Sequence, residues 1–422
     1  MKVMVVGGGG REHAIIRKIK ENKSVDVIFA LPGNGGISRD AVCVDIGATD
    51  LDAIVDFAQK KRVDYAVVAP DDPLALGLVD MLEAVGIPSF GPHKNAALIE
   101  ASKSFAKDQM KKYGIPTASY EVFTDMGKAL EYVRSQEPPV VVKADGLALG
   151  KGVTIAETVE EAEAAVKSMM EDRKFGDSGA KVVIEEYLEG PEVSVLSFTD
   201  GNAIIPMISS MDHKRALDGD KGPNTGGMGA IAPNPYYTPE IAERCMKEIF
   251  VPTIKAMNAE GRQFRGCLYF GLMITKDGPK AIEYNCRFGD PETQVVLPLL
   301  ESDLLDVMMH VTNGTLSEAD VRFSDDCACC VVVASKGYPV KYEKGYEIFI
   351  PEGMENIYVA GAKEINGRLV TSGGRVLGVT CTGRDLKLAI TNAYQDVSKV
   401  RFENDFYRRD IGAAALAALE NR

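Results

Sequence analysis

The chain has 422 residues and a formal net charge of -13, with 45% hydrophobic and 26% charged residues. This length allows two or three domains with their own cores, because most domains contain ~100–200 residues. The acidic balance argues against general binding to nucleic acid or to an acidic membrane, so any bound phosphate must be held locally by glycine loops, lysines or a metal ion.

No apolar segment reaches the ~20 residues needed to cross a bilayer, and we expect a cytoplasmic protein. The eight cysteines include a cluster from Cys327 to Cys330. The sequence has no second cysteine cluster and no histidine pair to complete a zinc site. We therefore expect reduced thiols on a buried strand.

Strand-like and helix-like stretches alternate through the first hundred residues. Short apolar runs predict strands at residues 2–7, 25–31, 64–70 and 86–92. The amphipathic stretch 51–61 predicts a helix between them. This alternation predicts a doubly wound parallel sheet, whose ligands lie at the carboxyl ends of the strands. The loops at those ends are residues 7–13, 32–36 and 70–77.

The glycine cluster Gly7 to Gly10 follows the first predicted strand. Backbone N–H groups at the start of a helix can hold a phosphate, which makes phosphate binding the leading interpretation. The G-x-G-x-x-G spacing of a dinucleotide site is not kept, because Glu12 or His13 stands where the third glycine is expected. A merely tight turn and a nicotinamide site are the alternatives.

The next region begins with residues 97–117, which predict one helix ended by Gly114 and Pro116. Two β-branched runs with glycine-rich turns follow, at 138–156 and 180–201. The stretch 212–230 is so rich in glycine, aspartate and proline that we expect no regular structure there. A loop of this length is usually a lid or a binding loop.

Lys143 ends an apolar strand and precedes a glycine-punctuated hairpin loop. A buried ammonium group needs an anionic partner, and a phosphate would supply it. The loop differs from the Walker A pattern because Lys151 is followed by Gly152 and not by Ser or Thr. Taken alone, an exposed hairpin is an equally good interpretation.

Three acidic residues surround the end of another apolar strand: Glu185, Glu186 and, after a turn, Glu192. Backbone groups at such a strand end can pair with the edge of an adenine. A carboxylate a few residues later can accept hydrogen bonds from ribose hydroxyls. A solvated acidic turn is the alternative, and it is the simpler interpretation of this stretch alone.

A polar stretch from Glu283 to Glu292 follows the apolar run 267–274. On a strand, Glu283 and Asn285 share one face, so both side-chain oxygens can reach one ion. Mg²⁺ takes one or two protein oxygens and leaves its other positions to water and phosphates. Arg287 has the same parity and can hold phosphate or carboxylate oxygens, while Asp290 and Glu292 can orient it or bind a second metal. A surface acidic patch is the alternative.

From about residue 325 the pattern changes to short β-rich runs, at 327–339 and 374–383, and then to a helical pattern at 385–400. This pattern predicts a small mixed α/β domain at the end of the chain.

The order of these motifs resembles the glycinamide ribonucleotide synthetases, a family of ATP-grasp ligases. The matching stretches are "ASKSFAK", "VVKADGLALGKGV", "VIEEYLEGPEVS", "DHKRALDGDKGPNTGGMGA", "EYNCRFGDPETQ", "GGREHA", "PGNGG", "TSGGRVL" and "YRRDIG". The resemblance implies an α/β protein with the ATP-grasp fold. Its implied parts are an N-terminal doubly wound parallel α/β domain at 1–100, an ATP-grasp domain at 101–324 with a mobile lid subdomain at about 118–192, and a small C-terminal mixed α/β domain at 325–422.

The resemblance also implies a reaction. ATP drives the joining of glycine to 5-phosphoribosylamine through glycyl phosphate, which gives glycinamide ribonucleotide, ADP and phosphate in purine biosynthesis. The implied cofactors are ATP and Mg²⁺ or Mn²⁺. The implied partners are the two small substrates, without nucleic acid or membrane, for a monomer that allows transient contact with the enzyme supplying phosphoribosylamine.

The family motifs further imply which residues bind. The implied ATP-binding residues are Lys103, Lys143, Asp145, Gly146, Gly150, Lys151, Gly152, Glu185, Glu186, Leu188 and Glu192. Glu283 and Asn285 match metal ligands, and Lys143 and Arg287 match catalytic residues at the transferred phosphate. The implied substrate residues are Gly8, Gly9, Gly10, Arg11, Glu12, Asn34, Gly35, Asp212, Lys214, Pro223, Asn224, Thr225, Gly226, Gly227, Met228 and Arg287.

Three other functions fit part of the sequence. Another carboxylate–amine ligase of the superfamily would share the ATP and metal residues but should lack the loop at 222–230. A nicotinamide-dependent oxidoreductase would use Gly7 to Gly10 and would leave Glu283 and Asn285 unexplained. A regulatory module would bind ATP without turnover.

Overall fold

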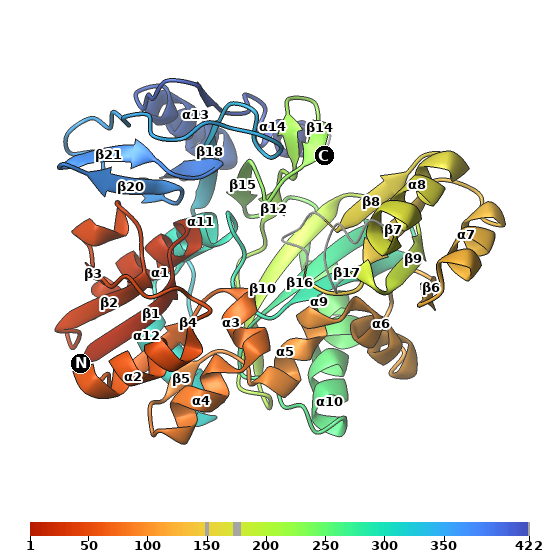
Figure 1. Ribbon diagram of the computed structural model, residues 1–422, viewed down its shortest axis with the longest axis horizontal. Coiled ribbons are helices and arrows are strands. Elements are labelled where there is room, and N and C mark those ends of the chain that lie inside the picture. The colour runs from red at the N-terminus through yellow and green to blue at the C-terminus, as the bar shows by residue number, and fades with distance from the viewer. Residues whose placement is uncertain (148–151, 172–178, 421–422) are drawn as a thin grey trace.

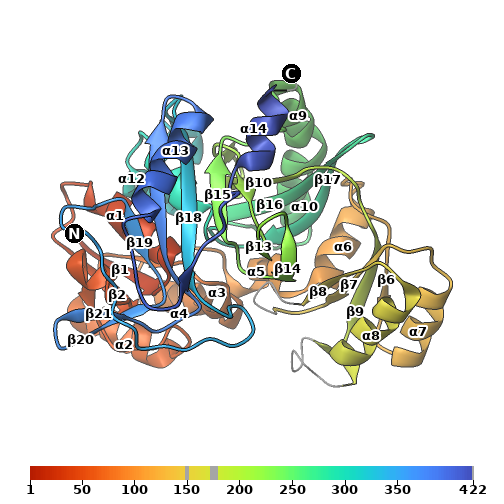
Figure 2. The same ribbon diagram turned by 90° about the horizontal axis from the view of Figure 1, so that it is seen from above.

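The computed structural model describes residues 1–147, 152–171 and 179–420. Three groups of elements surround a central antiparallel sheet (Figures 1 and 2). The N-terminal elements, in red and orange, lie on one side of it, and a small yellow unit built on β6–β9 lies on the other. The blue C-terminal elements lie beside both the N-terminal sheet and the central one. Gly150 and Lys151, which the family motifs assign to ATP, lie outside the described residues.

The N-terminal sheet has five parallel strands in the order β3-β2-β1-β4-β5. Its strands are β1 (Lys2–Gly7), β2 (Val27–Pro32), β3 (Val42–Cys43), β4 (Tyr65–Val68) and β5 (Ser89–Phe90). The helices of this region are α1 (Gly10–Lys20), α2 (Leu51–Lys61), α3 (Asp71–Leu76) and α4 (Leu78–Ala84). The prediction of a parallel α/β sheet is therefore confirmed.

The single helix predicted for 97–117 is wrong. Two helices occupy this region, α5 (Lys94–Ala101) and α6 (Lys103–Lys112). Ser102 separates them with extended backbone angles, φ -140° and ψ 110°, and its hydroxyl accepts a hydrogen bond from Phe105 N. Serine favours this capping position because its side chain satisfies a free N–H group of the first turn. The break places Lys103 at the start of a helix.

A small antiparallel sheet with its own hydrophobic core follows, in the order β6-β9-β7-β8. Its strands are β6 (Tyr120–Phe123), β7 (Val140–Ala144), β8 (Val153–Ala156) and β9 (Val182–Glu186). Two helices, α7 (Met126–Arg134) and α8 (Val159–Met170), pack on it (Figure 2). This sheet lies within residues 118–192, which we name the lid unit.

The central sheet has the antiparallel order β11-β10-β16-β17. Its strands are β10 (Glu192–Thr199), β11 (Ile204–Pro206), β16 (Gly266–Thr275) and β17 (Gly278–Asn285). The helical segment formed by α9 (Pro239–Cys245), the π-helical turn Met246–Phe250 and α10 (Val251–Ala259) packs against it.

The expectation that 212–230 lacks regular structure is also wrong. The region contains β12 (Met211–Asp212), β13 (Arg215–Leu217), β14 (Lys221–Asn224) and β15 (Gly229–Ala232). β13 and β14 form a hairpin, and β15 pairs with β18 (Cys327–Ser335), about a hundred residues away along the chain. Local composition does not show this pairing because the partner strand is remote in sequence.

The C-terminal region is a mixed α/β structure, as predicted. Its main sheet has the order β12-β15-β18-β22-β19, and β23 pairs with β18. The further strands are β19 (Ile357–Val359), β20 (Ala362–Ile365), β21 (Arg368–Thr371), β22 (Arg375–Gly383) and β23 (Asp405–Phe406). The helices are α13 (Leu386–Val397) and α14 (Ala413–Glu420). Cys329 and Cys330 are buried on β18, and all eight cysteines are free thiols.

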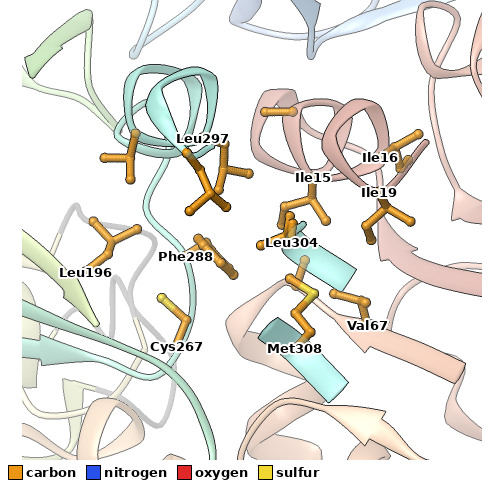
Figure 3. Packing of buried hydrophobic residues seen from close by; sticks show 14 of the residues in the cluster. Ile15, Ile16, Ile19, Val67, Leu196, Cys267, Phe288, Leu297, Leu304 and Met308 are labelled. Carbon is orange, nitrogen blue, oxygen red and sulfur yellow. The ribbon is translucent and has the colours of Figure 1, made fainter. Parts of the chain in front are cut away.

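One hydrophobic cluster joins the N-terminal sheet to the central sheet (Figure 3). Phe288 lies in its middle, with ring centroids 6.0 Å from Phe90 and 6.1 Å from Phe198. It is surrounded by side chains from α1, from α12 (Leu304–Asn313) and from Leu297, the residue that follows α11 (Thr293–Val296). Phe288 directly follows Arg287, so this packing fixes the backbone next to a predicted catalytic side chain. Among the described helices, none is both long and apolar enough to cross a membrane.

Replacing Phe288 by Ala should lower the free energy of unfolding by about 3–5 kcal/mol, because a buried ring is lost and a cavity remains. The matched control is Phe349→Ala, since Phe349 is 63% exposed and its loss should cost less than about 0.5 kcal/mol. Urea unfolding of both variants measures the difference. Equal midpoints would contradict this view of the core.

Candidate active site

A cavity of about 1020 Å³ lies where the lid unit, the central sheet and the β13–β14 hairpin meet the N- and C-terminal regions. It has polar walls on several sides and is large enough for a nucleotide with a second ligand. The predicted site residues that line it are Arg11, Lys103, Lys143, Gly152, Glu185, Glu186, Leu188, Glu192, Asp212, Lys214, Asn224, Thr225, Gly226, Glu283, Asn285 and Arg287. The sequence motifs thus come together from separate parts of the fold.

Glu185 lies between two buried lysines at one wall of the cavity. Its Oε1 is 2.9 Å from Lys143 Nζ, and its Oε2 is 2.8 Å from Lys107 Nζ. Burial lowers the pKa of Lys107 to about 8, although Glu185 acts in the opposite direction. The anionic partner that Lys143 requires is therefore present within the protein, and the Glu185 side chain holds this lysine in place.

Lys103 lies at the break between α5 and α6, close to the loop after β7. Its Nζ donates to Gly146 O at 2.9 Å, and its backbone N–H donates to Asp145 O at 2.9 Å. Asp145 Oδ1 also accepts from Ser104 N. Asp145 and Gly146 do not line the cavity, and they anchor the start of the glycine loop to α6.

The end of β9 and the start of β10 form another wall. Glu186 Oε1 accepts a hydrogen bond from Ser119 N at 3.0 Å, and Leu188 is buried. Glu192 Oε2 pairs with Lys214 Nζ at 2.8 Å, which connects the lid unit to the segment before the β13–β14 hairpin.

Glu283 and Asn285 lie on the same face of β17 and both line the cavity. Burial alone would raise the pKa of Glu283, but Lys214, Lys143 and further nearby cations lower it, so the carboxylate is charged. Asn285 Oδ1 accepts from Arg287 Nη2 at 3.3 Å. A charged carboxylate oxygen next to an amide oxygen is a donor set that suits a hard divalent cation.

Arg287 is held by a carboxylate that the sequence motifs did not indicate. Glu100, at the end of α5, accepts from Arg287 Nη2 at 3.0 Å and from Cys286 N at 2.7 Å. Arg287 Nε is buried and has no hydrogen-bond partner in the described part of the chain. Cys286 is buried in the core, on the side of the chain away from Asn285.

The N-terminal glycine loop is shaped by its own side chains. Glu12 accepts from Gly9 N at 2.6 Å and from Arg11 Nε at 2.6 Å. Asn34 Nδ2 donates to Gly8 O at 2.9 Å and to Val359 O at 2.8 Å. Only Arg11 of this predicted set lines the cavity. The other predicted residues of this set do not line the cavity: Gly8, Gly9, Gly10, Glu12, Asn34 and Gly35.

Asn224 at the end of β14 and the next residues, Thr225 and Gly226, line the cavity, whereas Pro223, Gly227 and Met228 lie outside the lining. Two C-terminal side chains hold Gly226: Tyr338 OH accepts from Gly226 N at 3.1 Å, and Arg375 Nη1 donates to Gly226 O at 2.7 Å. Both also line the cavity. Arg375 lies in the "TSGGRVL" stretch, so its glycine-rich context was the available signal.

A second set of contacts fastens the hairpin to the chain segment 408–412, which we name the clasp. Arg408 is 2% exposed, and its Nη1 donates to Asp220 Oδ1 at 2.8 Å and to Arg215 O at 3.1 Å. His213 Nδ1–H donates to Gly229 O at 3.2 Å, while its Nε2 accepts from Gly412 N at 3.1 Å. Burial, reinforced by the charge of Arg408, lowers the pKa of His213 to about 4. The neutral ring thus holds the backbone between Asp212 and Lys214.

A cavity between two antiparallel sheets, with the buried Lys143 from one and the carboxylate–amide pair of Glu283 and Asn285 from the other, defines a protein of the ATP-grasp class. Models of the phosphoribosylglycinamide synthetase N domain, ATP-grasp (A) domain and C domain match residues 1–100, 101–293 and 328–414. The chain belongs to the phosphoribosylglycinamide synthetase family.

Individual relatives support this assignment over the whole chain. A phosphoribosylamine–glycine ligase of Clostridium acetobutylicum is 49% identical over 98% of this chain and 99% of its own length. One of Halalkalibacterium halodurans is 48% identical over 99% of this chain and 98% of its own. The crystal structure of a phosphoribosylamine–glycine ligase from Thermotoga maritima is 36% identical with a TM-score of 0.87, covering 97% of this chain and all of that one.

A more distant structure shares the fold. Biotin carboxylase of Campylobacter jejuni is 16% identical with a TM-score of 0.74, covering all of this chain and 95% of that one.

The neutral His213 predicts a pH dependence of stability. The unfolded chain binds a proton on this histidine below its ordinary pKa of 6.5, whereas the folded chain does so only below about 4. The free energy of unfolding should therefore increase as the pH is raised from 4 to 6.5. The contribution of this histidine to that increase is about 3 kcal/mol at most.

His213→Gln provides the comparison, because glutamine places an amide oxygen near the Nε2 position and does not titrate. Urea unfolding at several pH values should show a flatter dependence for the variant between pH 4 and 6.5. Parallel curves for the two proteins would contradict the assignment of a neutral ring.

Proposed function

We propose that this protein is an ATP-dependent ligase that joins glycine to 5-phosphoribosylamine and forms glycinamide ribonucleotide, ADP and phosphate. The observation that carries the proposal is a single cavity that is lined both by Lys103 and Lys143 and by Asn224 to Gly226, at the end of β14. The names of relatives with nearly half of their residues identical, over full length, support the same reaction.

The nucleotide would lie between the lid unit and the central sheet. Apolar side chains there, among them Ile155, Leu188 and Met273, would hold the adenine, and Glu192 would accept hydrogen bonds from the ribose. Lys103 and Lys143 would contact the phosphates, with the glycine loop after Asp145 closing over them. The ion pair of Glu192 with Lys214 would have to loosen for the ribose contact.

Glu283 and Asn285 would hold a divalent cation, Mg²⁺ or Mn²⁺, at the phosphate end of the nucleotide. When bound, such an ion neutralises charge on the phosphate oxygens. Neighbouring side chains position the two ligands: Lys214 lies 4.0 Å from Glu283 Oε1, and Arg287 donates a hydrogen bond that orients the Asn285 amide.

The reaction proceeds in two steps. The glycine carboxylate attacks the γ-phosphate of ATP and forms glycyl phosphate with release of ADP. The amine of phosphoribosylamine then attacks the glycyl carbonyl carbon, expels phosphate and loses a proton. Negative charge builds on phosphoryl and carbonyl oxygens in both steps, so Lys143 and Arg287 would act through electrostatics and positioning.

Closure of the lid unit would protect the acyl phosphate from water. The lid unit suits a rigid movement because it has its own sheet and its own core.

The test of the proposed function is an omission assay. ADP release is measured with Mg·ATP, glycine and phosphoribosylamine generated in place from ribose 5-phosphate and ammonia, and each component is left out in turn. ADP that appears only in the complete mixture, with an equal amount of glycinamide ribonucleotide, supports the ligase. ATP consumption that does not need glycine would remove glycine as the substrate and leave the family assignment standing.

Glu283→Gln should lower turnover by about 100-fold or more, because the variant weakens the metal ligand set while the amino-acid side of the cavity stays intact. The glycine KM should change much less. Glu131→Gln on the exposed face of α7 is the matched control and should retain full activity. Wild-type turnover of Glu283→Gln at saturating Mg²⁺ would refute the metal assignment.

A further inference from the structure

The β13–β14 hairpin borders the cavity but has no hydrophobic anchor of its own. It forms a separate two-stranded sheet, and such a hairpin is marginally stable when it stands alone. Among residues 215–224, all of which the structure describes, only Ala216 is buried, and none belongs to a hydrophobic core cluster. Leu217 is 52% exposed. Polar contacts therefore set the position of this hairpin.

The clasp supplies these contacts at the turn of the hairpin, residues 218–220. Three consecutive residues of the clasp bind the three consecutive residues of the turn. Arg409 N donates to Asp218 Oδ1 at 2.8 Å, Gly219 N donates to Asp410 Oδ2 at 2.7 Å, and Arg408 Nη1 donates to Asp220 Oδ1 at 2.8 Å. Every residue of the turn is thus held by the C-terminal region.

Arg408 is the centre of the clasp, and it is 2% exposed. Its Nε and Nη2 donate to the two carboxylate oxygens of Asp410, both at 2.8 Å, and this bidentate pairing fixes the plane of the guanidinium. Its Nη1 donates to Arg215 O at 3.1 Å as well as to Asp220. Tyr394 of α13 donates to Arg408 O at 2.8 Å, so the C-terminal domain holds the clasp in turn.

The contact with Arg215 leads to the cavity. Arg215 pairs with Asn224 on the opposite strand of the hairpin. Asn224 lines the cavity, and its side-chain amide makes no hydrogen bond with any described residue. Such an amide offers both a donor and an acceptor to a polar ligand. Arg408 is buried outside the lining of the cavity, so it can act on a ligand only through the hairpin.

We propose that Arg408 is a positioning residue for phosphoribosylamine, whose clasp contacts set where the Asn224 amide lies in the cavity. The inference rests on the proposed function. Phosphoribosylamine carries hydroxyl and phosphate groups that an amide can bind. Its amine must approach the glycyl carbonyl carbon to about 3–3.5 Å, so a small displacement of a group that orients the sugar weakens productive binding. ATP lies on the side of Lys103 and Lys143, which the hairpin does not carry, and its binding should not depend on the clasp.

The test is the steady-state kinetics of Arg408→Met, which removes the guanidinium contacts and keeps an apolar side chain in the buried place. The KM for phosphoribosylamine should rise roughly 10- to 100-fold, the loss expected for a hydrogen bond that involves a charged group. The KM for ATP should stay within about twofold of the wild-type value. Arg409→Met is the matched control and should keep both wild-type KM values. Arg409 is exposed, and among the described residues it contacts the hairpin only through its backbone N–H.

A double-mutant cycle with Asn224→Ala distinguishes positioning from a general loss of structure. Where Arg408 acts through Asn224, the change Arg408→Met should raise the KM for phosphoribosylamine by less than about twofold once the amide has been removed. Effects of the two substitutions that simply multiply would show that Arg408 acts elsewhere, and they would overturn the inference.

Asp218→Ala is the second variant, because Asp218 is exposed and lies outside the lining of the cavity. It removes one clasp contact and leaves Arg408 intact, so the test stands even where Arg408→Met folds poorly. The KM for phosphoribosylamine should rise roughly 2- to 10-fold, as expected for the loss of one hydrogen bond. An unchanged KM for phosphoribosylamine in both variants, or an equal rise in the KM for ATP, would overturn the inference. A wild-type enzyme that does not use phosphoribosylamine in the omission assay would instead overturn the proposed function.

Discussion

The ion pair of Glu185 with Lys143 and Lys107 is the interaction on which the cavity depends. Glu185 lies near the end of β9, Lys143 near the end of β7 and Lys107 on α6. The ion pair therefore joins the lid unit to the helix that carries Lys103. All three side chains are almost fully buried. Removing one partner of such a set leaves a buried charge uncompensated, at a cost of about 3–5 kcal/mol. Lys143, the lysine that would meet phosphate, is thus oriented by an internal anion.

Packing has the same role on the opposite wall. Phe288 is fixed among aromatic rings of the N-terminal and central sheets, and the neighbouring Arg287 is held by Glu100 from α5. The guanidinium therefore has little freedom to turn away from the cavity. Positioning of this kind supports electrostatic catalysis, because the charges need not reorganise during the reaction.

Much of the fold follows from local patterns. Alternating apolar runs gave correct expectations for β1, β4 and β18, since buried strands have few polar residues. The same reasoning failed at Ser102, where one side-chain hydroxyl ends a helix that composition alone would continue. It failed again at 212–230, because β15 is stabilised by β18, and no neighbouring residue reveals that pairing.

The residues of the candidate site could likewise be predicted only in part. Lys143, Glu283 and Arg287 stand out because charged residues at the end of apolar strands are unusual. Glu100 and Tyr338 did not stand out, since each lies in an ordinary local context and meets the site only through tertiary contacts. Contacts between residues remote in sequence have no local signal to read.

The two sides of the cavity are held in different ways, and this difference bears on how it works. The hairpin side is fastened by buried or partly buried hydrogen bonds that Arg375, Arg408 and the Gly412 backbone N–H donate from two parts of the C-terminal region. The lid unit has a separate core, and its contacts with the central sheet include Lys143 Nζ to Ile282 O at 3.3 Å. The proposed mechanism therefore assigns the movement that would exclude water to the lid unit rather than to the hairpin side. In the proposed mechanism, closure of the lid unit on a nucleotide would leave the groups that orient the second substrate in place.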